Sequence, residues 1–199
     1  MDLNHSKLVL EELGRFHASS LLFEETLSPK TISESFEHMQ EPNEDNEAFK
    51  IFEMMIKAQA KNASLYLKNL PKYEKCVKWL DANHDNLQRL YIDALKNNKK
   101  KLSEVLIHGD CWTNNILFKY NENSDPVDVR FVDLQISRKS SPVEEIHYFF
   151  YSSLSGDTRV NNFQLMLYTY YQSFSKVLLF ARRKVPFTFK ELFKRDGEK

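Results

Sequence analysis

Apolar residues recur every three or four positions along most of the chain, on both sides of one β-rich segment. This spacing predicts helices over residues 6–24, 54–67, 73–95 and 163–181. The third is expected to run without a break, and Pro186 is expected to close the fourth. His17 falls on the apolar face of the first helix, so a hydrogen-bonded core histidine is expected there rather than a catalytic one.

The segment over residues 105–135 has the composition of short strands and turns. Strand-like runs are VLIH at 105–108, NILFKY at 115–120 and VDVRFVD at 127–133. Between the last two, NENSDP is a turn sequence of Asn, Ser, Asp and Pro. These two strands are therefore predicted to pair as a β-hairpin, and the expected fold class is α+β, mostly helical.

The predicted hairpin brings three oxygen-bearing side chains toward one edge. Asn115 stands at the start of the first strand and Asp133 at the end of its antiparallel partner, while Asp110 lies in the loop that enters this edge. Two carboxylates and an amide oxygen are hard ligands that suit Mg²⁺ held partly by a substrate's phosphates. One carboxylate would then be available for proton transfer.

The composition fits one globular domain and argues against several partners. With 199 residues and 42% hydrophobic content, the chain can form a sizeable core, so a single domain over 1–199 is expected. Its 28 basic and 28 acidic residues balance, which argues against nucleic acid or a membrane surface as a partner. Cys76 and Cys111 lack metal-ligand spacing, and no signal peptide or membrane span is evident, so a cytoplasmic location is expected.

The central motif resembles the catalytic loop of kinases. Asp110 and Asn115 stand five residues apart, as the Asp and Asn of that loop do, and a strand ending in Asp133 follows. With Gly109 where protein kinases carry Arg, the HGDxxxxN form is similar to aminoglycoside phosphotransferases and choline kinases. The chain most resembles the insect ecdysteroid kinase-like family, also called CHK kinase-like, in the segments LVLEELGRFHASS, HGDCWTNNILFKY and VDVRFVDLQISRKSSPVEEIHYFFYSSL.

The resemblance implies a role for several residues of the loop. Asp110 would accept the proton of a substrate hydroxyl, or orient that hydroxyl. Asn115 and Asp133 would bind Mg²⁺ that bridges the phosphates of ATP. His108 is expected to brace the loop through a hydrogen bond to backbone near Asp133, rather than to act as a base.

Three neighbouring residues have open or altered roles. Trp112 either walls a substrate pocket or packs the loop, and Gln135 either supports the metal ligands or is a plain strand-end residue. Glu145 stands where the family usually carries an Asp that supports the catalytic loop. The longer side chain is expected to affect the rate more than the fold.

A kinase of this type also needs a small N-terminal lobe, with a glycine loop over the phosphates and a Lys that pairs with them. The residues before HGD read as helix, with Gly14 as their interior glycine, so this lobe is expected to be absent. The chain would then be most of a C-terminal lobe of a protein kinase-like fold, from a truncated gene model, a short transcript or a degenerate paralogue. Its expected parts are a helical segment at 1–100, the catalytic loop and hairpin at 105–135, and a helical segment at 142–199.

Two functions follow from the resemblance. The first is an ATP-dependent kinase-like protein that phosphorylates a small-molecule alcohol, with a steroid hydroxyl such as that of an ecdysteroid as a candidate, this chain being inactive alone. The alternative is a pseudokinase-like module that binds a ligand or a partner without catalysis. A helical interaction protein with an accidental HGD motif is disfavoured, because five matched positions would then be chance.

Overall fold

The computed structural model describes residues 1–39, 47–97 and 102–197. The packing of the chain divides it into two compact units, which we call the core unit (Met1–Glu41 with Lys101–Lys199) and the helical unit (Pro42–Lys100). The assignment of both units to one domain stays a prediction. The predicted helical segments also include residues 40–46, 98–100 and 198–199, which lie outside the described residues.

The core unit contains the longest helices of the described chain. Its α-helices are α1 (Leu3–Thr26), α2 (Ile32–Ser35), α6 (Pro142–Ser153), α7 (Gly156–Phe180) and α8 (Phe189–Gly197), and its 3₁₀ turns are η1 (Glu37–Met39) and η3 (Thr113–Asn115). Helix α1 begins at Asp2, whose side chain accepts the backbone N–H of His5. The predictions over 6–24 and 163–181 are thus confirmed as α1 and α7.

Helix α7 ends differently from the prediction. It stops at Phe180, before Pro186 is reached, because Arg182 takes a left-handed conformation with φ 57°. The backbone N–H groups of Arg182 and Arg183 then bond back to the last turn of the helix. A capping turn therefore closes α7, and the prediction that Pro186 does so was wrong.

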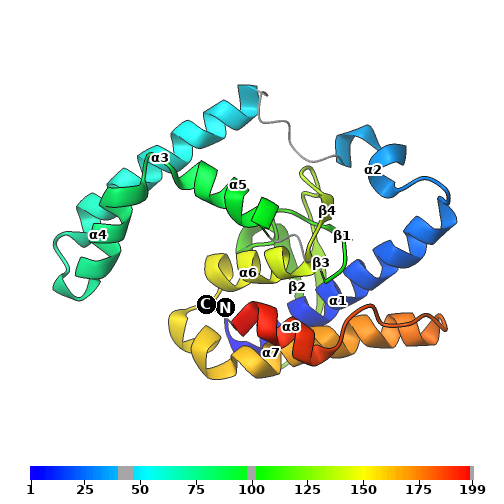
Figure 1. The fold of residues 1–199 in the computed structure, drawn as a ribbon. Coiled ribbons are helices and arrows are strands. Elements are labelled where there is room, and N and C mark those ends of the chain that lie inside the picture. Colours follow the sequence, from blue (N-terminus) through cyan, green and yellow to red (C-terminus); the bar gives the residue numbers. More distant parts are fainter. Residues whose placement is uncertain (40–46, 98–101, 198–199) are drawn as a thin grey trace. The chain divides into compact units, whose positions relative to one another are not determined.

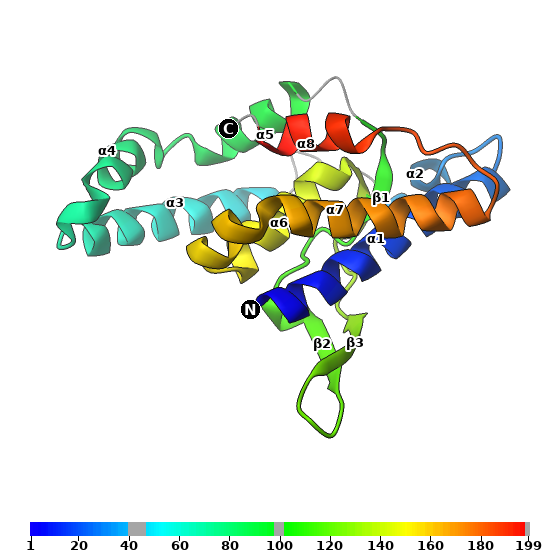
Figure 2. The same ribbon diagram turned by 90° about the horizontal axis from the view of Figure 1, so that it is seen from below.

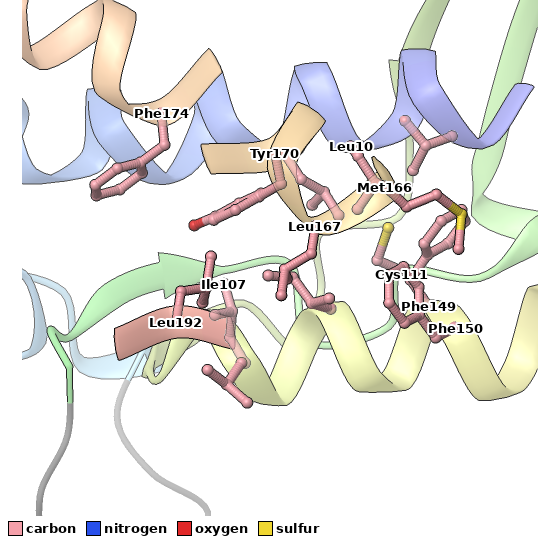
Figure 3. Close-up of a cluster of buried hydrophobic side chains, with 14 of the residues drawn as sticks. Leu10, Ile107, Cys111, Phe149, Phe150, Met166, Leu167, Tyr170, Phe174 and Leu192 are labelled. Carbon is pink, nitrogen blue, oxygen red and sulfur yellow. The ribbon is translucent and has the colours of Figure 1, made fainter. Parts of the chain in front are cut away.

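Helices α1 and α7 run side by side in both views (Figure 1 and Figure 2). They approach each other closely at Gly14, where an added Cβ would stand 2.7 Å from the carbonyl oxygen of Tyr170. Around this crossing, helices α1, α6, α7 and α8 bury one apolar core together with β1 and the loop after it. Figure 3 labels ten of its side chains: Leu10, Ile107, Cys111, Phe149, Phe150, Met166, Leu167, Tyr170, Phe174 and Leu192.

Two small antiparallel sheets complete the core unit. Strand β2 (Ile116–Tyr120) pairs with β3 (Pro126–Phe131) in the predicted hairpin, with Ile116 opposite Phe131. Strand β1 (Val105–Ile107) pairs with β4 (Arg138–Ser140), an element that the sequence pattern did not predict. Mostly helical structure with small antiparallel sheets confirms the expected α+β class.

The helical unit consists of α3 (Glu47–Leu67), η2 (Pro71–Tyr73), α4 (Glu74–Asn83) and α5 (Leu87–Asn97). The prediction of one unbroken helix over 73–95 was wrong, because a turn at 84–86 separates α4 from α5. The side chain of Asn83 donates to the carbonyl oxygen of Trp79, and such local bonds from Asn and Asp favour turns over helix. Apolar spacing continues through the turn because both α4 and α5 pack on α3. No helix in the described ranges is long and apolar enough to cross a membrane.

Candidate active site

The HGD loop follows β1 directly, in the core unit. Gly109 has φ 86°, a left-handed conformation that side chains with a Cβ rarely adopt. A Cβ at this position would also stand 2.4 Å from the carbonyl oxygen of Ile136. The glycine of the motif is therefore required by both the backbone conformation and the close approach of the chain that leads into β4.

The carboxylate of Glu145 lies beneath this loop. Glu145 comes from the first turn of α6, which Ser141 caps, and its side chain is buried, with 1% exposed. Oε1 accepts the backbone N–H of Gly109 at 2.8 Å and Oε2 accepts that of His108 at 2.9 Å. The longer side chain thus reaches the HGD loop and holds two consecutive backbone donors.

The contacts of His108 determine which of its ring nitrogens carries the proton. Nε2 lies 2.9 Å from the carbonyl oxygen of Val132, which can only accept a hydrogen bond. Nδ1 accepts the backbone N–H of Asp110 at 3.3 Å. These partners assign a neutral ring that is protonated on Nε2. A ring in this state braces the loop against the backbone before Asp133, in the geometry expected from the sequence.

The carboxylate of Asp110 is held by two neighbours. Nδ2 of Asn115 donates to Oδ2 of Asp110 at 2.9 Å and to its carbonyl oxygen at 3.0 Å. The hydroxyl of Tyr148 donates to Oδ1 at 2.6 Å. The sequence did not mark Tyr148 as a site residue, although its position three residues after Glu145 on α6 places both on one helix face.

Asp133 lies just beyond the end of β3, with φ 66° and an exposed side chain. The residue before it, Val132, is held through both of its backbone polar groups: its N–H donates to the carbonyl oxygen of Asn115 at 3.0 Å, and its carbonyl oxygen accepts from His108. Gln135 donates to Oδ2 of Asp133 at 3.2 Å. The structure therefore keeps Asp133 out of the helical core and next to the backbone that holds Asn115.

The oxygen atoms at this edge suit a magnesium ion. Asn115 uses Nδ2 for both of its side-chain contacts to Asp110, which leaves its Oδ1 as a ligand atom, and Asp133 adds a carboxylate. No group of three or more His, Cys, Asp or Glu side chains in the described ranges is arranged to hold a metal. An amide and a carboxylate fit Mg²⁺, which keeps waters and substrate phosphates among its ligands.

Three further residues lie next to the HGD motif: Cys111 and Trp112 follow it in sequence, and His17 bonds to Glu145 beneath it. Trp112 is partly buried, and its indole nitrogen has no partner among the described residues, so its contacts favour neither a pocket role nor a packing role. Burial raises the pKa of the Cys111 thiol well above its usual value, and the nearby Glu145 carboxylate adds to this rise. Cys111 is thus a neutral core residue. His17 is fully buried with both ring nitrogens bonded, as expected for a core histidine.

The sequence model of the ecdysteroid kinase-like family matches residues 1–181. This match covers most of the chain, including the HGD loop and the hairpin, so the chain belongs to that family. Membership confirms the resemblance carried by the three motif segments. No curated protein and no solved structure matches the chain.

Proposed function

We propose that this member of the ecdysteroid kinase-like family is built to transfer a phosphoryl group to the hydroxyl of a small-molecule alcohol, with an ecdysteroid as a candidate substrate. The observation that carries the proposal is the carboxylate of Asp110, which Asn115 and Tyr148 hold at the end of a braced loop. Asp110 would accept the proton of the substrate hydroxyl or orient it. The hydrogen bond from Tyr148 supports this role, because it shows that a hydroxyl group can reach Oδ1.

Asn115 and Asp133 would hold Mg²⁺, with Gln135 supporting the carboxylate of Asp133. When bound, the ion would neutralise charge on the phosphates and fix their position. The chain's own part is to present these oxygens without rearrangement. The bonds from the backbone N–H and carbonyl of Val132 to Asn115 and His108 serve this end, since they tie the backbone before Asp133 to the catalytic loop.

We also propose that the core unit corresponds to the C-terminal lobe of a kinase-like fold and that residues 1–199 alone are inactive. Four exposed aliphatic side chains stand close to the site residues in sequence: Leu117, Val132, Leu134 and Ile136. Exposed apolar surface of this kind commonly marks an interaction site. An ATP-binding lobe that covers this edge would explain their exposure.

The expected inactivity follows from the contacts that such a lobe would supply. A glycine loop and a phosphate-binding Lys are charged or polar contacts, and the loss of each typically costs about 2–5 kcal/mol. At about 1.4 kcal/mol per tenfold, two such losses weaken ATP binding on the order of a thousandfold. General-base catalysis by Asp110 contributes only about a hundredfold to ten-thousandfold, which does not compensate for an unpositioned phosphate.

The test combines turnover and metal binding in purified residues 1–199. Labelled ATP and Mg²⁺ are incubated with a panel of ecdysteroids and other alcohols, and the wild type is compared with Asp110→Asn. We expect no Asp110-dependent transfer. In parallel, Mn²⁺ should broaden the amide resonances of Asn115 and Asp133, and Asp133→Asn should abolish this effect. Asp128→Asn, which removes a carboxylate from the same hairpin outside the site, is the matched control.

The outcomes separate the two functions. Transfer that disappears in Asp110→Asn would establish the phosphotransferase and overturn the expected inactivity of this chain. Broadening that Asp133→Asn removes and Asp128→Asn retains would support the metal-binding role. Broadening that is absent, or that survives Asp133→Asn, would overturn that role and favour a ligand-binding or partner-binding module without catalysis.

A further inference from the structure

A buried chain of hydrogen bonds connects the first helix to the catalytic loop. His17 of α1 lies between Tyr170 of α7 and Glu145 of α6, and all three side chains are at most 1% exposed. Nε2 of His17 is 2.8 Å from Oε2 of Glu145, and Nδ1 is 2.9 Å from the hydroxyl of Tyr170. Because Oε2 also accepts the N–H of His108, one oxygen atom joins His17 to the loop.

The partners of Glu145 assign the protons in this chain. The backbone N–H groups of His108 and Gly109 can only donate, and donors directed at a carboxyl group favour its ionised form. An ionised carboxylate only accepts, so Nε2 of His17 carries a proton. With Nδ1 unprotonated, the hydroxyl of Tyr170 donates to it. In each of these hydrogen bonds, a donor then faces an acceptor.

Burial makes these donors necessary. A carboxylate removed from water is strongly unfavourable unless hydrogen bonds or opposite charge compensate it. Neither the neutral thiol of Cys111, nor the neutral ring of His108, nor the acidic side chain of Asp110 compensates this charge. Among the described residues, the ring N–H of His17 is therefore the side-chain group that donates a hydrogen bond to the Glu145 carboxylate.

The last side-chain torsion of Glu145, which rotates the carboxylate, has a broad range of preferred angles. Both of its oxygens must face the loop at once, because each accepts a different backbone N–H. The bond from His17 restricts the rotation of the carboxylate, and the bond from Tyr170 restricts the ring of His17. The orientation of Glu145 is thus set by two helices that carry no residue of the loop itself.

We infer that His17 is a positioning residue for Asp110, acting through Glu145 and the backbone of the HGD loop, with Tyr170 fixing its ring. The inference rests on the proposed function for its catalytic meaning, since Asp110 is the group being positioned. It gives His17 a role at the site beyond that of the hydrogen-bonded core histidine expected from the sequence.

The test is amide hydrogen exchange by NMR on residues 1–199, with two substitutions of His17. His17→Leu removes the donor to Glu145, so exchange at the His108 and Gly109 amides should accelerate about tenfold or more relative to Val129 in β3. His17→Gln keeps an N–H for Glu145 and an oxygen that accepts from Tyr170, so it should restore most of the protection. Tyr170→Phe keeps the ring but removes the hydroxyl, and it should give an intermediate acceleration even if His17→Leu fails to fold.

Leu13→Ala is the matched control, because Leu13 is fully buried on the same face of α1 but does not bond the loop. It should lower the free energy of unfolding, while the exchange rates of the His108 and Gly109 amides relative to that of Val129 should stay unchanged. The inference would be overturned if His17→Leu and Tyr170→Phe changed this ratio no more than Leu13→Ala does, or if His17→Gln behaved like His17→Leu. The readout needs neither ATP nor Mg²⁺, so a failure of the proposed phosphotransfer would not be mistaken for a failure of this inference.

Discussion

Replacing Gly14 by alanine should separate the two long helices of the core unit. The new Cβ would lie 2.7 Å from the carbonyl oxygen of Tyr170, 2.8 Å from the backbone nitrogen of Phe174 and 2.9 Å from Cβ of Ser173. These atoms belong to the backbone or the first side-chain atom of α7, so no flexible side-chain end can move aside. The helices must shift apart or bend.

The magnitude follows from two opposing effects. Overpacking in a close-packed core typically costs about 1–3 kcal/mol, whereas alanine stabilises a helix interior by about 0.5–1 kcal/mol relative to glycine. Because three contacts are too short at once, we expect the upper part of the overpacking range. The net loss in the free energy of unfolding of the core unit should then be about 1–2 kcal/mol.

The assay is denaturant unfolding of residues 1–199, followed by the far-ultraviolet helix signal. Gly156→Ala is the matched control: this glycine opens α7, and an added Cβ would meet nothing within 4 Å. It should be neutral or stabilising by up to about 1 kcal/mol. If Gly14→Ala were as stable as the wild type, or shifted stability in the same direction as Gly156→Ala, the steric reasoning would be refuted.

Three further predictions follow from the same structure. Burial and the raised pKa of Cys111 should keep it unreactive toward iodoacetamide in the native state while exposed Cys76 is alkylated, and equal rates would contradict this. Asp2→Ala removes the N-cap of α1 and should lower the free energy of unfolding by about 0.5–2 kcal/mol at pH 7. Hydrogen bonds from His5, led by its backbone N–H, lower the pKa of Asp2, so the difference in stability from wild type should shrink as the pH falls below about 4. A difference that does not change with pH would refute this prediction. Exposed Leu134 and Ile136 are expected to make residues 1–199 self-associate, so Leu134→Lys with Ile136→Lys should reduce self-association in light scattering, and unchanged association would exclude these side chains as its cause.

Helices and the hairpin could be predicted because their signals are local. Apolar spacing of three and four residues follows from the geometry of a single helix, so the buried face of α1 was evident from the sequence. A turn sequence between two strand-like runs likewise specified the β2–β3 hairpin. The pairing of β1 with β4 was not visible, since three-residue strands carry too little pattern and their pairing depends on how the chain returns from the hairpin.

The break at 84–86 shows where periodicity misleads. Apolar spacing stays in phase there because α4 and α5 both pack on α3, whereas the backbone follows the local preferences of Asn and Asp. Only the hydrogen bonds of the folded chain show that the helix has ended.

For the candidate site, the sequence by itself determined which residue types are present and predicted that Asp110, Asn115 and Asp133 meet at one edge. The spacing of Asp110 and Asn115 and the hairpin that leads to Asp133 carried that prediction. Only the tertiary structure placed the hydroxyl of Tyr148 on Asp110 and tied His17 to Glu145. These contacts join residues far apart along the chain, and they depend on how α1, α6 and α7 pack around one core. Residue spacing records the face that each helix buries, but not which side chains meet across that core.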